Sequence, residues 1–355
     1  MSCSGRRPMN GFLKFILIAL SLILLVIAIV AVYFWNKLDL ITYADEVEFV
    51  VSTEPFEEYT ADLSGLEISE TVPVIQDTEI RSEDDVQNIL LLGTDERSKD
   101  FNFDARADCI ILVSINKDKK TVNLVSFERA IGVPILEGDY EGQYDMLTHI
   151  FRWGGSELVA KTIEHCFKID IDHYVRLNFA SVMNIVDTIG GIDVYLTARE
   201  AEAINSSHYE NYFLKKEVIM TEGINHLNGA AALAFARLRN IDSDWQRVER
   251  QRKVILGVVD KLKDSDLMVI DDLADAVLPM IQTDMTKMDI TGLVLYAPNF
   301  LMSEFDQMTI PKQGTYGGMK IRTPGGAFAV DYEINNDLLH RFLYEGATSE
   351  ELLAE

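Results

Sequence analysis

The stretch "NILLLGT", residues 88–94, decides the fold class of this chain. It is a short and nearly all-apolar run that ends at a glycine, which is the pattern of a strand buried on both faces. Two similar runs follow, "CIILVSIN" at 109–116 and "KTVNLVSFE" at 120–128. Because only the turn "KDK" separates them, they predict a hairpin, so the sheet must contain some antiparallel pairing and is expected to be mixed.

Helical and strand-like segments alternate after this hairpin. Apolar residues recur at helical spacing in 156–167, and helices are also predicted at 180–190, 228–239 and 245–263. Strands are predicted at 173–179 and 192–196, and again in "QMTIP" and "AFAVDY" near the end of the chain. Residues 265–303 are predicted to be helical, with loops near Pro279 and Pro298. This alternation around apolar strands indicates an α/β layered fold.

An apolar run near the N-terminus predicts a transmembrane helix. Residues 15–35, "FILIALSLILLVIAIVAVYFW", carry no charge and are long enough to cross about 30 Å of hydrocarbon as a helix. Arg6, Arg7 and Lys14 precede the run, which places the N-terminus in the cytoplasm. A cleaved signal peptide is the alternative, but the run exceeds the usual apolar region of about 7–15 residues, and no small-x-small cleavage site follows it.

The rest of the chain is then expected to face outward. The acidity of the chain, whose net charge is −25 over all 355 residues, argues against nucleic acid as a partner. Residues 36–87 are rich in acidic and hydroxyl side chains and have weak periodicity, which is typical of a stalk or linker. The predicted organisation is a cytoplasmic N-terminus (1–14), the membrane helix (15–35), the stalk (36–87), one folded domain (88–345) and a C-terminal tail (346–355).

Cysteine usage favours a domain without a disulfide framework. Cys109 and Cys166 are the only cysteines beyond the membrane segment. One disulfide between them is a possible pairing, but Cys109 lies in a strand-like run and Cys166 in a helical pattern. Two small buried thiols are therefore the favoured interpretation.

Arginine is concentrated in one stretch, "ALAFARLRNIDSDWQRVERQRK" at 232–253. Guanidinium groups are planar donor forks that suit phosphate and carboxylate, and crowded arginines need an anion between them. The predicted helix that begins near Ser243 and Asp244 adds free N–H groups and a favourable dipole. A solvated helix face is the alternative interpretation; a binding site for a diphosphate is the favoured one. The arginines concerned are Arg237, Arg239, Arg247, Arg250 and Arg252.

A second group of polar residues lies at the predicted strand ends. Asp95 follows the first apolar strand and Asp108 opens the next one. Arg97, Arg106 and Arg129 are near them in sequence. Two carboxylates beside a diphosphate would suit Mg²⁺, which commonly takes one or two carboxylates plus phosphate oxygens. Aspartates in loops are more often turn formers or helix caps, so spacing alone is a weak signal.

The strand segments quoted above and the arginine-rich stretch resemble the LytR–CpsA–Psr proteins of bacterial cell envelopes. The resemblance covers roughly residues 88–260, and the tail "MTIPKQGTYGGMKI" is similar as well. The segments that carry it are "NILLLGTDER", "ARADCIILVSIN", "VNLVSFERAIGVPI", "FASVMNIVDTIGGIDVYL" and, most specifically, "HLNGAAALAFARLRNIDSDWQRVERQRKVI".

The resemblance implies an α-β-α sandwich with a hydrophobic lipid pocket and a phosphotransferase activity. Such enzymes move a glycopolymer, for example teichoic acid or capsule, from an undecaprenyl diphosphate carrier to peptidoglycan. By resemblance, Asp95 and Asp108 hold magnesium and belong, with Arg129 and Arg239, to the catalytic residues. The residues implied to grip or line the diphosphate site are Arg106, Arg129, Arg237, Arg239, Asp244, Arg247 and Gln251.

The sequence departs from the family pattern at several positions. Ala130 follows the arginine of "SFERAIG" where members usually carry an acidic residue, and Thr148 stands in "LTHIFRWGG" in place of an asparagine. The segment "HLNGAAAL" also lacks the usual acidic–amide pair. Ala130 therefore raises the question of whether this member has lower or specialised activity.

The expected chemistry is attack by an acceptor hydroxyl on the sugar-proximal phosphorus, with undecaprenyl monophosphate leaving. Positioning and charge stabilisation carry most of such a reaction. Asp95 is a candidate acceptor for the hydroxyl proton, while His149 and His226 are rival bases that are more often structural. The main alternative function is a regulator that binds a polyprenyl diphosphate without turning it over. A third alternative is transcriptional attenuation, against which the acidic outward domain argues.

Overall fold

The computed structural model describes residues 31–44, 61–95, 105–206, 219–238, 241–265, 267–323 and 325–354. The chain divides into two compact units, residues 1–40 and 41–355. In the first unit, residues 31–37 are helical and a short 3₁₀ turn, η1 (Leu38–Leu40), follows. None of the helices in the described ranges is both long and apolar enough to span a bilayer. The predicted membrane helix at 15–35 lies mostly outside the described residues.

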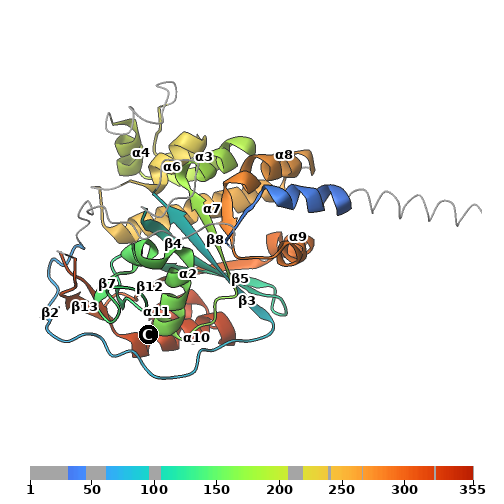
Figure 1. Ribbon diagram of the computed structural model, residues 1–355. Helices are drawn as coiled ribbons and strands as arrows, with labels where there is room; N and C mark the ends of the chain where they lie inside the picture. The colour runs from blue at the N-terminus through green and yellow to red at the C-terminus, as the bar shows by residue number, and fades with distance from the viewer. Residues whose placement is uncertain are drawn as a thin grey trace, which may run out of the picture. The chain divides into compact units, whose positions relative to one another are not determined.

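A seven-stranded sheet forms the centre of the second unit. Figure 1 shows its longer strands with helices packed around them. The strand order is β1-β11-β8-β3-β4-β5-β12. The strands are β1 (Thr42–Tyr43), β11 (Ile281–Thr283), β8 (His173–Asn178), β3 (Val86–Thr94), β4 (Ala107–Asn116), β5 (Thr121–Phe127) and β12 (Glu304–Ile310).

The sheet is mixed, as the sequence predicted. β4 is antiparallel to both β3 and β5, and the hairpin between β4 and β5 confirms the prediction made from the "KDK" turn. β8 is parallel to β3, and β12 is parallel to β5. The α/β fold with a mixed central sheet is therefore confirmed.

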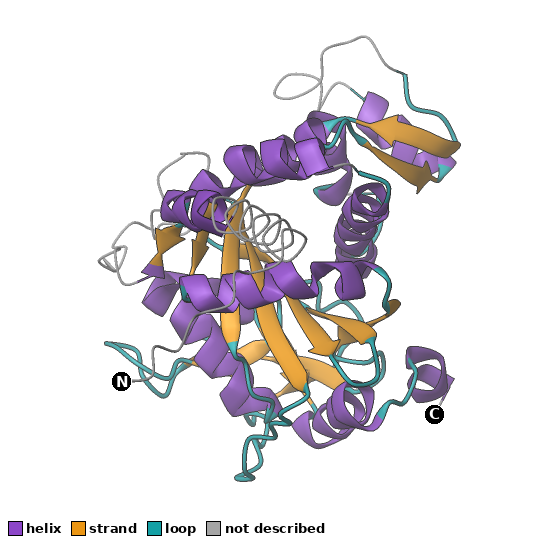
Figure 2. Ribbon diagram, turned by 90° about the vertical axis from the view of Figure 1, so that its right-hand side faces the viewer, coloured by secondary structure: helices purple, strands orange, loops and turns teal. Residues whose placement is uncertain are grey.

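Alternating side chains of the central strands serve two separate cores. Leu90 and Leu112 point to a core shared with α2 (Leu147–Phe167) and α10 (Tyr332–His340). Ile89 and Val113 point to the opposite core, which includes partly buried residues of α7 (Asp244–Lys263) and α9 (Lys287–Leu301). Because neighbouring residues on a strand face opposite ways, each apolar run is buried on both sides. The result is an α-β-α sandwich, with helices on either side of the strands in Figure 2.

A third apolar cluster joins the end of the sandwich to a small helical layer. It is built by α3 (Phe179–Thr188), α4 (Ala198–Asn205), α6 (Gly229–Ala236) and the hairpin of β9 (Ile192–Leu196) and β10 (Gly223–Leu227). Val254 on α7 packs into this cluster, while Leu256 on the same helix contacts the sheet core. α7 is therefore fixed between both layers, which sets the position of its N-terminus.

Several predicted boundaries differ from the structure. The segment 265–303 is not helical throughout: α8 (Leu267–Val277) and the 3₁₀ turn η3 (Leu278–Met280) lead into β11 before α9 begins. The prediction missed β11 because three residues are too few to show a period of two. Pro298 lies inside α9 rather than in a loop. α2 begins at Leu147 and has a break at Gly154 and Gly155, whereas the apolar spacing predicted only its second half.

Parts of the predicted stalk and tail pack on the domain. Within 36–87, β2 (Ile68–Ser69) pairs with β13 (Tyr316–Met319), which in turn pairs with β14 (Ala327–Val330). Leu63, Leu66 and Ile75 contact the main core. In the tail, α11 (Ser349–Ala354) buries Leu352 in the same core. The apolar residues in this polar segment are too widely spaced to show a helical or strand period. Each of them can nevertheless be buried against the surface of the folded domain. The remaining short elements are β6 (Gly132–Pro134), β7 (Tyr144–Met146) and the π-helix η4 (Arg341–Glu345).

Both domain cysteines are free thiols. Cys166 is buried, and burial raises the pKa of its thiol to about 12. Cys109 lies directly opposite Gly93 in the β3–β4 ladder, where the register shifts. A Cβ atom at position 93 would lie 2.8 Å from the Cβ of Cys109. Glycine is therefore required there for the two strands to approach each other beside the cavity described below.

Candidate functional site

The ends of β4 and β5 bring the first two predicted site residues together. Asp108 is the second residue of β4, and Arg129 comes just after β5 ends at Phe127. The strands are antiparallel neighbours, so the start of one lies beside the end of the other. Arg129 Nη1 donates a hydrogen bond to Asp108 Oδ1 at 2.6 Å, and the arginine side chain is only 2% exposed.

The first turn of α7 adds Asp244 and Arg247 to this pair. Arg129 Nε and Nη2 donate to the two carboxylate oxygens of Asp244, each at 3.1 Å. Arg247 Nη2 also donates to Asp244 Oδ2 at 3.1 Å. Asp108, Arg129, Asp244 and Arg247 therefore form one arginine–carboxylate cluster, although 115 positions separate Arg129 from Asp244. The helix N-terminus adds positive potential at the same place.

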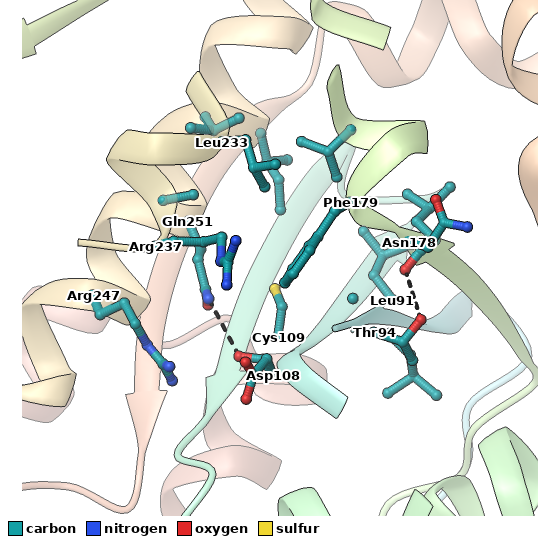
Figure 3. A pocket seen from close by; sticks show the side chains of 17 residues that line it. Leu91, Thr94, Asp108, Cys109, Asn178, Phe179, Leu233, Arg237, Arg247 and Gln251 are labelled. Atoms are coloured by element: carbon teal, nitrogen blue, oxygen red, sulfur yellow. Dashed lines mark hydrogen bonds between the residues drawn. The ribbon is translucent and has the colours of Figure 1, made fainter. Parts of the chain in front are cut away.

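An apolar cavity of about 130 Å³ extends from this cluster between the sheet and the helical layer. Asp108 and Arg247 are among its lining residues. Figure 3 shows Arg237, Arg247 and Gln251 on the helix side, facing Asp108 and Cys109 on β4. Its apolar walls are formed by Leu91, Leu92, Leu177, Phe179, Val182, Leu233, Ala236, Val254 and Ile255.

Two further predicted residues lie in this cavity. Gln251 Nε2 donates to the backbone oxygen of Asp108 at 3.3 Å, which connects α7 directly to β4. The guanidinium of Arg237 lies 4.1 Å from the centre of the Phe179 ring, at the end of α6. A cation over an aromatic face is held in place while its outer edge remains a hydrogen-bond donor. Arg237 is therefore oriented within the cavity by α3.

Asp95 and Arg106 form a pair of their own at the strand ends. Arg106 donates to Asp95 Oδ2 from Nε at 3.1 Å and from Nη2 at 2.9 Å, and its backbone N–H donates to Asp95 Oδ1 at 2.8 Å. Neither residue is among those that line the apolar cavity. The expected convergence of Arg106 with the other arginines is therefore not seen in the contacts that the structure describes. Arg239 and Arg97 lie outside the described residues.

Two arginines of the sequence cluster are structural. Arg250 donates from Nη1 and Nη2 to the carboxylate of Asp242 at 2.7 and 2.8 Å, and Nη2 also donates to the backbone oxygen of Leu238. Arg252 donates to Ser126 on β5 at 2.8 Å and to Thr309 on β12 at 2.7 Å. Both side chains are buried. They tie α7 to its surroundings, while Arg247 and Arg237 face the cavity.

Glu128 is a site residue that the sequence analysis missed. Its side chain is fully buried next to Arg129, and neither carboxyl oxygen has a hydrogen-bond partner among the described residues. Burial, and then the negative charge of Asp244, raise the pKa of Glu128 to about 8, against the opposing effects of Arg247 and Arg129. In the sequence, a glutamate before the arginine of "SFERAIG" has nothing to mark it, because its burial depends on α7.

The two candidate histidines lie elsewhere. His149 is fully buried and its Nδ1 is 2.8 Å from Asp145 Oδ1. His226 is exposed, and its Nδ1 is 2.7 Å from Asp193 Oδ1 on the neighbouring strand β9. Neither histidine lines the apolar cavity. Their positions match the structural roles that the sequence analysis considered more frequent.

No group of three or more histidine, cysteine or acidic side chains converges on a metal position within the ranges that the structure describes. Asp95 and Asp108 are two carboxylates on neighbouring strand ends, and each is bound to an arginine. A cation held there would need further oxygen ligands from a bound molecule. This is compatible with Mg²⁺, which often keeps one or two carboxylates and completes its shell with phosphate oxygens and water.

The fold and the site define the class of protein: an α-β-α sandwich whose arginine–carboxylate cluster closes one end of an apolar cavity, which suits an anion with an apolar tail. Comparison with known families makes this specific. The sequence matches the LytR_cpsA_psr family over residues 56–327, and the chain belongs to this family. The resemblance stated from the motifs is confirmed.

Curated relatives are teichoic acid transferases. One is the "Polyisoprenyl-teichoic acid--peptidoglycan teichoic acid transferase TagT" of Bacillus subtilis, which is 31% identical over 225 residues, or 62% of this chain and 67% of the relative. The chain spans between 51% and 67% of the lengths of the first four curated relatives.

Solved structures share the fold. "TagT bound to LIIa-WTA" has a TM-score of 0.58 at 25% identity and covers 77% of this chain and 97% of its own. The "LytR-CPS2A-psr family protein YwtF (TagT) with bound octaprenyl pyrophosphate lipid" has a TM-score of 0.54 at 23% identity and covers 77% of this chain and 96% of its own. At the identity of this second structure, the match concerns the fold alone.

Proposed function

We propose that this protein is a membrane-anchored phosphotransferase that moves a glycopolymer from an undecaprenyl diphosphate carrier to peptidoglycan. The observation that carries the proposal is the arginine–carboxylate cluster at the end of an apolar cavity. Membership of a family whose curated members are teichoic acid transferases supports the same reaction class.

The apolar cavity suits the prenyl chain of such a donor, and the arginine–carboxylate cluster suits its diphosphate. The prenyl chain would occupy the apolar cavity between Phe179, Leu233 and Val254. The diphosphate would lie at its polar end, where Arg247 and Arg237 face the cavity and Arg129 is held by two carboxylates. Guanidinium forks bind phosphate oxygens in pairs, which fixes the phosphorus as well as attracting it.

Magnesium is part of this proposal. Asp108 and Asp95 would hold it, because both are oxygen ligands on adjoining strand ends, and the diphosphate would complete the shell. The bound ion would neutralise charge on the diphosphate oxygens. The arginines bound to the two aspartates hold these carboxylates in place for such a role.

The transfer itself is a displacement at phosphorus. The acceptor hydroxyl oxygen forms a bond to the sugar-proximal phosphorus, and the bond from that phosphorus to the bridging oxygen breaks. The glycopolymer phosphate is then joined to the acceptor, prenyl monophosphate leaves with the bridging oxygen, and the hydroxyl proton goes to a base. Arg129 and Arg247, both buried, are preorganised to stabilise the charge that develops.

Membrane anchoring completes the proposed arrangement. The uncharged run at 15–35, with basic residues before it, would hold the domain on the outer side with its N-terminus in the cytoplasm. The donor's prenyl tail would start in the same bilayer as the anchor. This topology is tested by labelling cysteines introduced on either side of the run in intact cells, which should react from outside only when placed after residue 35.

The alternative function is a regulator that binds polyprenyl diphosphate without transfer, and Ala130 is the residue that favours it. The decisive experiment incubates the full chain with a prenyl-diphosphate-linked sugar, Mg²⁺ and a peptidoglycan fragment, and follows release of prenyl monophosphate. The wild type should release it, and Asp108→Asn and Arg247→Met should not. Tight lipid binding without any release by the wild type would overturn the enzyme proposal and leave the regulator.

A further inference from the structure

A second hollow, of about 360 Å³, lies beside the arginine–carboxylate cluster and has a different chemistry from the apolar cavity. Arg247 lines both spaces, so they share a wall at the cluster. We call it the aromatic hollow. It is lined by Glu128, Arg129, Asp242, Ser243, Asp244, Trp245 and Tyr316 together with Asp62, Ser64, Leu66, Leu238, Arg247 and Phe328.

One wall of the aromatic hollow is a stack of rings. The Trp245 ring lies on Tyr316 with the centroids 5.7 Å apart and the planes at 29°. Tyr316 in turn packs on Phe328 at 4.7 Å, so the stack is supported from behind. Trp245 is partly exposed at the start of α7. A broad aromatic surface next to carboxyl groups suits a ligand with an apolar face and hydroxyls at its edge, which describes a sugar ring.

The buried residue Glu128 is among those that line this hollow. Buried polar atoms are nearly always hydrogen-bonded, yet no N–H or hydroxyl donor among the described residues reaches either Glu128 oxygen, and its polar neighbour Asp244 is another carboxyl group. The charged and titratable groups around it are Arg129 beside it in sequence, Asp244, Arg247 and Arg252 on α7, and Tyr316 on β13. A hydroxyl that entered the hollow would supply the missing donor.

We infer that the aromatic hollow binds the acceptor carbohydrate of the proposed transfer, with a sugar ring on Trp245 and the attacking hydroxyl donating its proton to Glu128. The inference rests on the proposed function, whose acceptor it places. The donor diphosphate lies at the shared wall formed by Arg247, so the hydroxyl and the phosphorus meet there. When the oxygen–phosphorus bond forms, the proton passes to the Glu128 carboxylate, and it returns to solvent after prenyl monophosphate leaves.

Glu128 suits this task better than Asp95. Asp95 has both oxygens engaged by Arg106, whereas those of Glu128 are not engaged by any described donor. The pKa of Glu128, about 8, is much nearer to neutrality than that of an ordinary glutamate, and an acid–base group transfers protons best when its pKa is near the operating pH.

The test uses the full chain in detergent with a prenyl-diphosphate-linked sugar donor and the N-acetylglucosamine–N-acetylmuramic acid disaccharide as acceptor. Trp245→Ala should raise the acceptor KM about tenfold or more while the donor Kd changes less than about twofold. Glu128→Gln should lower kcat about a hundredfold and remove the rise of kcat with pH near 8. Tyr195→Ala, an exposed aromatic on β9, and Glu164→Gln, a half-buried glutamate on α2, are the matched controls and should behave as wild type.

Direct binding of the disaccharide, measured by calorimetry, separates this inference from the proposed function. If the wild type releases no prenyl monophosphate but binds the disaccharide, and Trp245→Ala weakens that binding while Trp245→Phe retains it, the hollow is a carbohydrate site and only the transfer proposal fails. An unchanged acceptor KM and disaccharide affinity in Trp245→Ala would overturn the placement of the acceptor. An unchanged kcat and pH profile in a folded Glu128→Gln would overturn the role of Glu128.

Discussion

Arg129 and Asp108 are joined by a 2.6 Å hydrogen bond, and the same guanidinium grips both oxygens of Asp244 on a distant helix. Each of its three donor nitrogens has a carboxylate partner, and the side chain is 2% exposed. The arginine cannot move freely toward a ligand. It is held in place in advance, which would lower the cost of ordering it around the diphosphate proposed above.

Replacing this arginine should unfold the site. In Arg129→Met, two carboxylates lose their common counter-charge, so the free energy of unfolding at pH 7 should fall by about 3 kcal/mol. Urea unfolding of the domain measures the change. The double variant Arg129→Met with Asp108→Asn removes one of the stranded charges and should recover part of the loss. A double variant no more stable than the single one would contradict this account.

Burial of Glu128 predicts that the domain loses stability as pH rises. The pKa of Glu128 in the folded state, about 8, lies above that of an unfolded glutamate. At pH values between these two pKa values, the folded state therefore holds a proton on Glu128 that the unfolded state has lost. Between about pH 5 and pH 8 the free energy of unfolding should therefore decrease, by at most about 1.4 kcal/mol per pH unit from this group. Glu128→Gln should flatten the decline, whereas Glu157→Gln, an exposed glutamate on α2, should not. Equal slopes in all three proteins would exclude the effect.

Substitutions of Arg252 and Arg247, which both lie on α7, should affect different properties: stability in the first case and lipid binding in the second. Arg252→Met breaks charged hydrogen bonds to Ser126 and Thr309, and should lower the free energy of unfolding by about 2–3 kcal/mol. Because its side chain points to β5 and β12, prenyl diphosphate affinity should persist at temperatures where the variant is folded. Arg247→Met should weaken lipid binding instead. Thermal unfolding and fluorescence binding titrations on both variants measure the two effects. Weaker lipid binding in a folded Arg252→Met, with unchanged binding in Arg247→Met, would contradict these two roles.

The close approach of β3 and β4 at Gly93 gives a packing prediction. In Gly93→Ala the new methyl group would meet the Cβ of Cys109 at 2.8 Å, and overpacking of this kind costs about 1–3 kcal/mol. Adding Cys109→Gly removes the opposing Cβ and should restore part of the stability. Circular dichroism melting curves compare the two variants. Full stability of Gly93→Ala alone would mean that the strands separate there more easily than their packing implies.

The apolar cavity should set how much of the prenyl chain is bound. Leu233→Trp places a larger side chain in a cavity of about 130 Å³, next to Phe179. Affinity for a long-chain prenyl diphosphate should fall about tenfold or more, while that for a short-chain analogue changes little. Leu273→Trp, at a partly buried position on α8 that does not line the cavity, serves as the control. Equal losses for both chain lengths would place the tail elsewhere.

Much of the fold was predictable from local patterns. The apolar runs at 88–94, 109–116 and 120–128 predicted the strands β3, β4 and β5, and the short turn between the last two runs predicted the antiparallel pairing of β4 with β5. The helix from Asp244 was predicted from its spacing and its polar start. By contrast, β11 and β2 were not predicted, because strands of two or three residues depend on a partner edge for their hydrogen bonds.

The site was only partly predictable. Residue chemistry placed Asp108 and Arg129 in one group and Asp244 and Arg247 in another, and only the resemblance to the family implied a single site for all four. The structure brings these four side chains into contact. Residue chemistry did not distinguish Arg250 and Arg252 from Arg247. All three have the same charge and lie in the same helix, but Arg250 binds Asp242 and Arg252 binds the sheet. Nor did it find Glu128, because its importance depends on being buried by α7.

The amino-acid sequence by itself determined the longer central strands, the main helices, the family and the chemical types that gather at the site, because these depend on spacing along the chain. Only the tertiary structure decided which side chains meet. It joined Arg129 to Asp244, kept Arg106 with Asp95, and buried Glu128 in the wall of the hollow that Trp245 and Tyr316 also line. Those outcomes depend on how α7 packs between two cores, and long-range packing of this kind leaves no periodic signal in the residues that it brings together.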